Sequence, residues 1–186
     1  MTEKIFYKDS YVTDFSATVL ECVDLNSGFK VLLDKTAFFA EGGGQKADTG
    51  FIGDAFVSDV QEEGENLYHY TDKKVNVGEI YFCKINWDVR FKRMQQHTGE
   101  HIVSGIVKKH FGYTNVGFHM EDDYVTVDFD GELNREQLDM VEKEANEAVY
   151  KNYNVKCWFP DEKQLENLDY RSKLDLTENV RIVTVE

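Results

Sequence analysis

The sequence has little of several residue types that mark particular classes of protein. It contains one proline, three cysteines and no apolar run long enough to cross a bilayer. Cys22, Cys83 and Cys157 are far apart and form no Cys-x-x-Cys pair, so we expect three reduced thiols, with Cys157 in the core. The N-terminus lacks the basic-then-apolar order of a secretory signal. We therefore expect a cytoplasmic protein with no membrane partner.

Positive charge is also scarce, since the formal net charge of the 186 residues is −14. Proteins bind the phosphate groups of nucleic acids mainly through Lys and Arg side chains, so the sequence argues against a protein that binds nucleic acid through charge alone. A local basic patch stays compatible with it. The 13 Phe and 10 Tyr residues provide large apolar side chains to bury, which excludes a disordered chain.

The first half of the chain has the pattern of a small β-barrel. Short apolar segments alternate with Gly, Asn and Asp, as expected for closely spaced strands. The pattern predicts strands at 15–23, 28–33, 36–40, 55–60, 66–70 and 79–85.

A change of period near Asn86 marks the second half. From there to Phe111 the apolar residues recur at helical spacing, with Asp88 as the expected N-cap and Gly112 as the expected stop. The apolar stripe consists of Ile102, Val103, Ile106, Val107 and Phe111.

The rest of the second half alternates strands and helices. We predict a second long helix at 134–152 with Leu138, Val141, Ala145, Ala148 and Val149 on its apolar face, and a short helix at 161–167. Strands are expected at 113–119, 124–130, 155–159 and 180–185. The predicted class is α+β: a barrel domain at 1–86, then an α+β domain at 87–186 with two long helices on a β-sheet.

The sharpest chemical signal is the segment from His97 to His101 inside the first long helix. Residues at i and i+4 lie one turn apart on one face, so two imidazoles at this spacing can bind one metal ion. Two unrelated histidines on a polar face are the plainer interpretation. A tight zinc site also needs three or four protein ligands.

The same five residues fit a second pattern. His97-x-x-Glu100-His101 matches the H-x-x-E-H motif of inverted zinc peptidases, in which the glutamate acts as a base. Such an enzyme needs a further acidic ligand downstream, for which Glu178 can be nominated. Acidic residues are so common in this chain that the match has little weight.

The surrounding sequence resembles one family in three separated blocks. Residues 85–102 are similar to the helix that carries the zinc-binding histidines of the AlaX and alanyl-tRNA synthetase editing family. Residues 36–50 look like its glycine-rich signature, and 116–120 with 125–129 are similar to its substrate-side strands. The opening residues 5–11 are typical of free-standing members, so the resemblance covers the whole chain.

This resemblance implies a small β-barrel followed by an editing domain, and an aminoacyl-tRNA hydrolase that removes serine or glycine from tRNA(Ala). It implies that His97 and His101 are zinc ligands at the catalytic centre and that Thr98 faces the aminoacyl group. The implied substrate-side residues are Thr98, Gly42, Gly43, Gly44, Gln45, Gly117, Phe118 and His119, of which the glycine loop would pack across the site.

Each of these residues also has a plainer role. Thr98 can bond to its own helix backbone, and the glycines can form a tight turn between strands. His119 is either a third metal ligand, a base, or a hydrogen-bonded strand residue. Arg90 and Arg93 contact either phosphate or the abundant carboxylates, and pairing with carboxylates is the safer expectation.

The sequence departs from the family at the zinc site. The family completes that site with Cys-x-x-x-His, and these 186 residues contain no such pair. The resemblance implies that both ligands lie beyond Glu186, so that this chain binds zinc weakly or not at all and is weak or inactive as a hydrolase. The alternatives are a non-catalytic aminoacyl-tRNA binding module and a fragment of the synthetase itself. The start at Met1 favours a separate editing factor.

Overall fold

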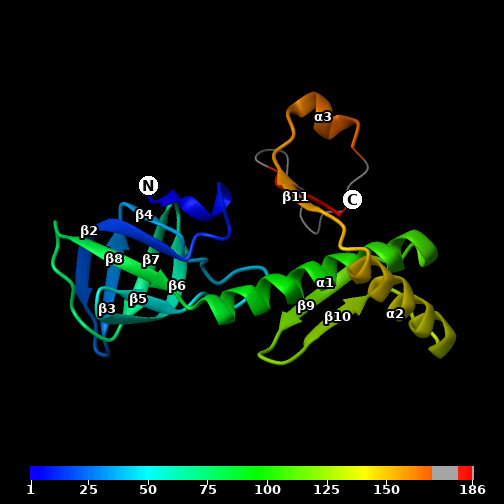
Figure 1. Cartoon of the computed structure of the whole chain (residues 1–186), viewed down its shortest axis with the longest axis horizontal. Helices are drawn as coiled ribbons and strands as arrows, with labels where there is room; N and C mark the ends of the chain where they lie inside the picture. The colour runs from blue at the N-terminus through cyan, green and yellow to red at the C-terminus, as the bar shows by residue number, and fades with distance from the viewer. Residues whose placement is uncertain (169–179, 186) are drawn as a thin grey trace. The chain divides into compact units, whose positions relative to one another are not determined.

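The computed structural model describes residues 1–168 and 180–185, and it confirms the α+β class (Figure 1). The β-rich half contains β1 (Glu3–Lys4), the 3-10 helix η1 (Ile5–Tyr7), β2 (Asp14–Asp24), β3 (Phe29–Leu33), β4 (Lys35–Thr36), β5 (Gly50–Ile52), β6 (Ala55–Glu63), β7 (Asn66–Thr71) and β8 (Ile80–Ile85). The other half contains α1 (Trp87–Phe111), β9 (Asn115–Met120), β10 (Val125–Phe129), α2 (Arg135–Tyr150), β11 (Val155–Trp158), α3 (Glu162–Glu166) and β12 (Ile182–Val185).

Two compact units share these elements. The first unit consists of Met1–Gln96 with His119–Tyr124, and the second of His97–Phe118 with Val125–Glu186. The predicted boundary at 86/87 falls between β8 and α1, whereas the packing divides the chain within α1. α1 therefore contributes to both units.

Six strands of the first unit close on themselves. They pair in the order β2-β3-β7-β6-β5-β8, and β8 pairs back with β2 (Figure 1). Alternate residues point into the interior, as the two-residue period of a strand requires. In β7, for example, Leu67, His69 and Thr71 are buried. The core packs Val31, Leu33, Phe38, Ile52, Val57, Val60 and Ile85 together.

Two sequence predictions in this unit need correction. The strand expected at 36–40 ends with β4 at Thr36. After Thr36, side-chain oxygens accept the backbone hydrogen bonds that a neighbouring strand would otherwise accept. Phe38 N donates to Thr36 Oγ1 at 3.1 Å, and Phe39 N donates to Asp48 Oδ2 at 2.7 Å. The short strand β5, which pairs with β6 and β8, was not predicted.

The ends of α1 follow local chemistry. The helix begins at Trp87, and Arg90 N donates to Asn86 O at 3.0 Å, so Asn86 and not Asp88 precedes the first turn. Asp88 lies within that turn, where a carboxylate complements the helix dipole. The predicted stop is confirmed, because Gly112 has φ +74° and donates its N–H to Lys108 O at 3.0 Å.

The second unit packs α1 against α2 beside β9 and β10 (Figure 1). Ile106, Val107 and Val141 form the buried centre, which confirms the apolar stripe of α1. Asn134 begins α2 with a capping box to Gln137. The prediction for the apolar face of α2 is wrong at its ends, because Leu138 is 46% and Val149 is 61% exposed.

β11 and β12 pair antiparallel, with Cys157 opposite Val183. The three cysteines are free, as expected, but Cys157 is exposed and not in the core, because it lies in a strand of which three of the four residues are exposed. Burial raises the pKa of the Cys83 thiol to about 12, so this cysteine is unreactive. Within the described ranges, no helix combines the length and hydropathy needed to cross a membrane.

Candidate metal centre

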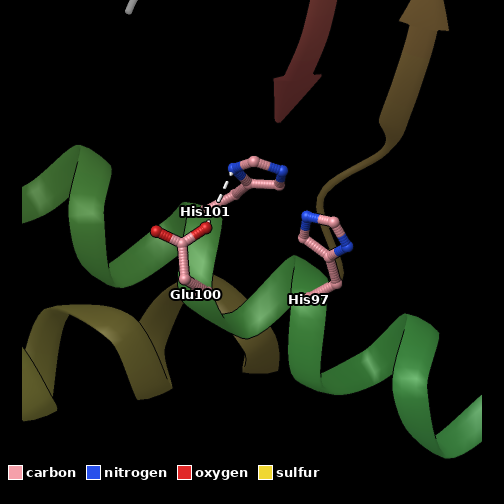
Figure 2. Close-up of side chains that lie close together, drawn as sticks. All are labelled: His97, Glu100 and His101. Atoms are coloured by element: carbon pink, nitrogen blue, oxygen red, sulfur yellow. Dashed lines mark ion pairs between the residues drawn. The ribbon is translucent and has the colours of Figure 1, made fainter. Parts of the chain in front are cut away.

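The period of α1 places His97 and His101 one turn apart on the same face. Their rings stack with centroids 4.8 Å apart and an interplanar angle of 25°. Figure 2 shows both imidazoles on the same side of the helix, with Glu100 beside His101. The His97 ring also stacks on Phe118 of β9, with centroids 5.4 Å apart. This contact orients the first histidine of the pair.

Glu100 completes a cluster of three candidate ligands. One ligand atom from each of His97, Glu100 and His101 lies within 4.8 Å of the other two. Glu100 Oε2 lies 3.2 Å from His101 Nδ1. No other group of three or more such side chains occurs in residues 1–168 and 180–185.

The donor set fits a zinc ion in part. Imidazole nitrogen and carboxylate oxygen are both zinc ligands, and two imidazoles at i and i+4 can reach one ion. His97 and His101 are half-buried, so an ion would be reachable from solvent. The cluster thus supplies two imidazoles and leaves further positions to other ligands.

The other residues expected near the substrate are spread over both units. Thr98 is half-buried on α1, directly after His97. Phe118 is buried and His119 is exposed on β9. Gly117 has a packing role, because a Cβ at this position would collide with the Asp128 side chain. The substrate roles of these residues stay predictions.

The glycine run forms a tight turn in the first unit. Gly42 and Gln45 exchange both backbone hydrogen bonds at 3.0 Å. Gly43 and Gly44, the two central residues, have φ of +60° and +87°. Positive φ at both central positions is the type I′ pattern, which favours glycine. The turn explains the glycines, and their role across the aminoacyl group stays a prediction.

Within the same unit, this turn lies against the end of β9. Met120 N donates to Gly44 O at 3.2 Å. Lys46 Nζ lies 3.2 Å from Asp122 Oδ1 and 3.3 Å from Glu121 Oε2, and these carboxylates raise the pKa of Lys46. The structure therefore joins the glycine block and the β9 block, which are separated by about 75 residues in sequence.

Arg90 and Arg93 bind protein groups in the first unit. Arg90 forms a buried ion pair with Asp48, in which both side chains are 1% exposed. Arg93 Nη1 donates to Ala47 O. The expectation that these arginines pair within the protein is confirmed for Arg90, although its partner is buried and not at the surface.

A cavity of about 1030 Å³ lies beside His101 in the second unit. Ile102, Ile106 and Met140 give it an apolar wall. Among the described residues, four basic side chains line it against two acidic ones: Lys109, Lys143, Lys151 and Arg181 against Glu144 and Glu147. The cavity is therefore locally basic in a chain whose net charge is −14.

Sequence reasoning missed the side chains that surround Glu100. Ser104 donates its hydroxyl to Glu100 Oε1, and Asn115 Nδ2 donates to the same oxygen at 2.5 Å. The i, i+4 spacing of Glu100 and Ser104 on α1 could have indicated their contact. Asn115 lies on β9, and no local spacing in the sequence links it to Glu100. Glu178, nominated for the peptidase alternative, lies outside the described residues.

Comparison with known proteins supports one family along the chain. Residues 4–89 match the family described as tRNA synthetases class II (A). The alanyl-tRNA editing protein AlaX-L of Pyrococcus horikoshii is 32% identical over 162 residues, which cover 83% of this chain and 40% of that protein. AlaX-M of Saccharolobus solfataricus is 36% identical over 167 residues, covering 86% of this chain and 69% of that protein.

A third relative is a synthetase. The alanine–tRNA ligase of Ignicoccus hospitalis is 30% identical over 197 residues, which cover all of this chain and 21% of the ligase. The chain thus spans less than half of AlaX-L, about two thirds of AlaX-M and about a fifth of the ligase. On these matches, the chain belongs to the family of AlaX editing proteins and alanyl-tRNA synthetase editing domains.

Proposed function

We propose that this chain hydrolyses the ester bond that joins a wrong amino acid, serine or glycine, to tRNA(Ala), at a zinc site built on His97 and His101. The observation that carries the proposal is the pair of stacked imidazoles on one face of α1, in a chain of this family. The locally basic cavity beside His101 supports it, since a tRNA end brings phosphate groups.

The chemistry needed is modest, because an aminoacyl ester is already labile. Hydrolysis requires a positioned water and stabilisation of the oxyanion that develops on the carbonyl. A zinc ion held by both imidazoles would supply a Lewis acid for that carbonyl and lower the pKa of the attacking water. The remaining task of the protein is to hold the two imidazoles in place, which the Phe118 ring does for His97.

Selectivity has its own physical requirement. A synthetase pocket cannot strongly reject a substrate that differs from alanine by one small group, so a second site must recognise the error. Thr98, one residue after His97, has a hydroxyl that can donate to or accept from the serine hydroxyl. We propose that Thr98 reads the side chain of the amino acid to be removed.

The test is deacylation of tRNA(Ala) charged separately with serine, glycine and alanine. We expect slow release of serine or glycine and retention of alanine. His97→Ala and His101→Ala should each reduce the release by about 100-fold or more, the scale seen when a group that stabilises the transition state is removed. His110→Ala is the matched control, because His110 lies on the same helix and pairs with Glu144 outside the cluster.

A non-catalytic aminoacyl-tRNA binding module is the second candidate. The observation that favours it is that, among the described residues, the cluster on α1 offers two imidazoles and one carboxylate, and that this carboxylate also accepts from Ser104 and Asn115. Saturable binding of charged tRNA without release above the spontaneous rate would support this module and contradict hydrolysis. Release that survives both histidine substitutions would contradict the proposed site.

A further inference from the structure

Glu100 presents its two carboxylate oxygens to different partners. Its side chain is 7% exposed, although it lies on a mostly polar helix. Oε1 accepts from Asn115 Nδ2 at 2.5 Å and from the Ser104 hydroxyl. Oε2 lies 3.2 Å from His101 Nδ1, the contact drawn as a dashed line in Figure 2. One oxygen is therefore anchored to the protein, and the other is directed at the imidazole.

The 3.2 Å contact between Glu100 Oε2 and His101 Nδ1 bears on which nitrogen of the imidazole carries the proton. An ionised carboxylate only accepts hydrogen bonds, so the nitrogen that faces it must be an N–H donor. In a neutral imidazole with Nδ1 protonated, Nε2 keeps its lone pair. We propose that Glu100 is a positioning residue that holds His101 in the Nδ1–H tautomer and thereby makes Nε2 the nitrogen available to a metal ion.

The two hydrogen bonds to Oε1 fix the orientation of the Glu100 carboxylate. Asn115 is buried, and its Oδ1 has no hydrogen-bond partner among the described residues, so the contact to Glu100 decides how its amide is oriented. With Ser104 and Asn115 both donating to Oε1, the carboxylate cannot rotate away from His101 without losing both bonds. The consequence for zinc rests on the proposed function; the tautomer itself does not.

The first experiment uses the unaltered, metal-free chain with ¹⁵N-labelled histidine. Long-range ¹H–¹⁵N spectra at about pH 8, above the ordinary His pKa of about 6.5, distinguish the two neutral tautomers. We expect His101 to show the Nδ1–H pattern. An Nε2–H pattern would overturn the proposal, and this arm requires no variant to fold.

The second experiment replaces Glu100→Gln. Ser104 and Asn115 are both donors, so they will donate to the oxygen of the new side-chain amide. The NH₂ group of that amide will then face His101 Nδ1. His101 should then switch to the Nε2–H tautomer, and zinc affinity should fall by about 10- to 100-fold, as for the loss of other groups that orient metal-bound histidines. A His101 that keeps the Nδ1–H pattern in this variant would overturn the proposal.

Two controls separate positioning from general damage. The His110 signal should be identical in both proteins, because His110 Nε2 pairs with Glu144 at 2.6 Å. Asp139→Asn, which removes a surface carboxylate paired with Arg135, should leave His101 unchanged.

If His101 behaves as expected but no amino acid is released from charged tRNA, the proposed hydrolysis fails and the positioning role stands. If amino acid is released but His101 shows the other tautomer, the hydrolysis stands and the positioning role fails.

Discussion

Replacing Arg90→Met is expected to lower the free energy of unfolding by about 3–5 kcal/mol, the usual cost of removing one partner of a buried ion pair. Arg90 Nε lies 3.0 and 2.9 Å from the two oxygens of Asp48. Its Nη1 donates to Ser10 O at 2.9 Å and its Nη2 to Ala37 O at 2.6 Å. The variant leaves the Asp48 carboxylate buried without its counter-charge, although the Phe39 N–H still donates to it. Urea unfolding measures the loss.

A double-mutant cycle tests whether the pair itself is responsible. Asp48→Asn should cost a similar amount, because it leaves a guanidinium buried without its counter-charge. The double variant should lose less than the sum of the two, by about 1–3 kcal/mol, since the residues are in direct contact. Strict additivity, or a single-variant loss below about 1 kcal/mol, would show that the pair does not hold α1 in the first unit.

Acid is expected to destabilise the first unit through His69. The ring is fully buried in β7, and burial lowers its pKa from 6.5 to about 4. Its Nε2 lies 2.8 Å from Thr36 Oγ1 and its Nδ1 lies 3.3 Å from Val31 O, which fits a neutral ring. Between pH 6.5 and about 4, His69 is protonated in the unfolded chain but stays neutral in the folded chain. Stability from this residue is therefore complete above pH 6.5 and is lost as the pH falls toward 4, by roughly 3 kcal/mol.

The measurement compares urea unfolding of the unaltered chain and of His69→Gln between pH 4 and pH 7.5. Many carboxylates also titrate at the acid end of this range, so the difference between the two proteins is the informative quantity. We expect the variant to be less stable at pH 7.5 but to lose less stability on acidification. Parallel pH profiles would contradict a neutral, buried His69.

Local periodicity explains what the sequence could predict. The apolar stripe of α1, its stop at Gly112 and the shared face of His97 and His101 all follow from a repeat of 3.6 residues. The alternation in β2, β6 and β7 follows from a repeat of two. These features depend on neighbours within a few positions, so one sequence contains the information.

Long-range contacts explain what it could not predict. The strand β5 has three residues and begins with a glycine, and besides its neighbour β6 it pairs with β8, more than 25 residues away. Asp48 and Arg90 are 42 positions apart. Asn115 reaches Glu100 from another element. No periodic pattern links such residues, so the packing that surrounds the candidate site had to come from the structure.

A zinc titration of the ¹⁵N-histidine-labelled chain tests the metal site most directly, because it detects weak binding as well as tight binding. A site on α1 predicts that the His97 and His101 signals shift together and saturate at about one zinc per chain, while buried His69 and the Glu144-paired His110 stay unchanged. Shifts of His110 alone, or no shift of His97 and His101 at any zinc concentration, would contradict a metal centre at this histidine pair.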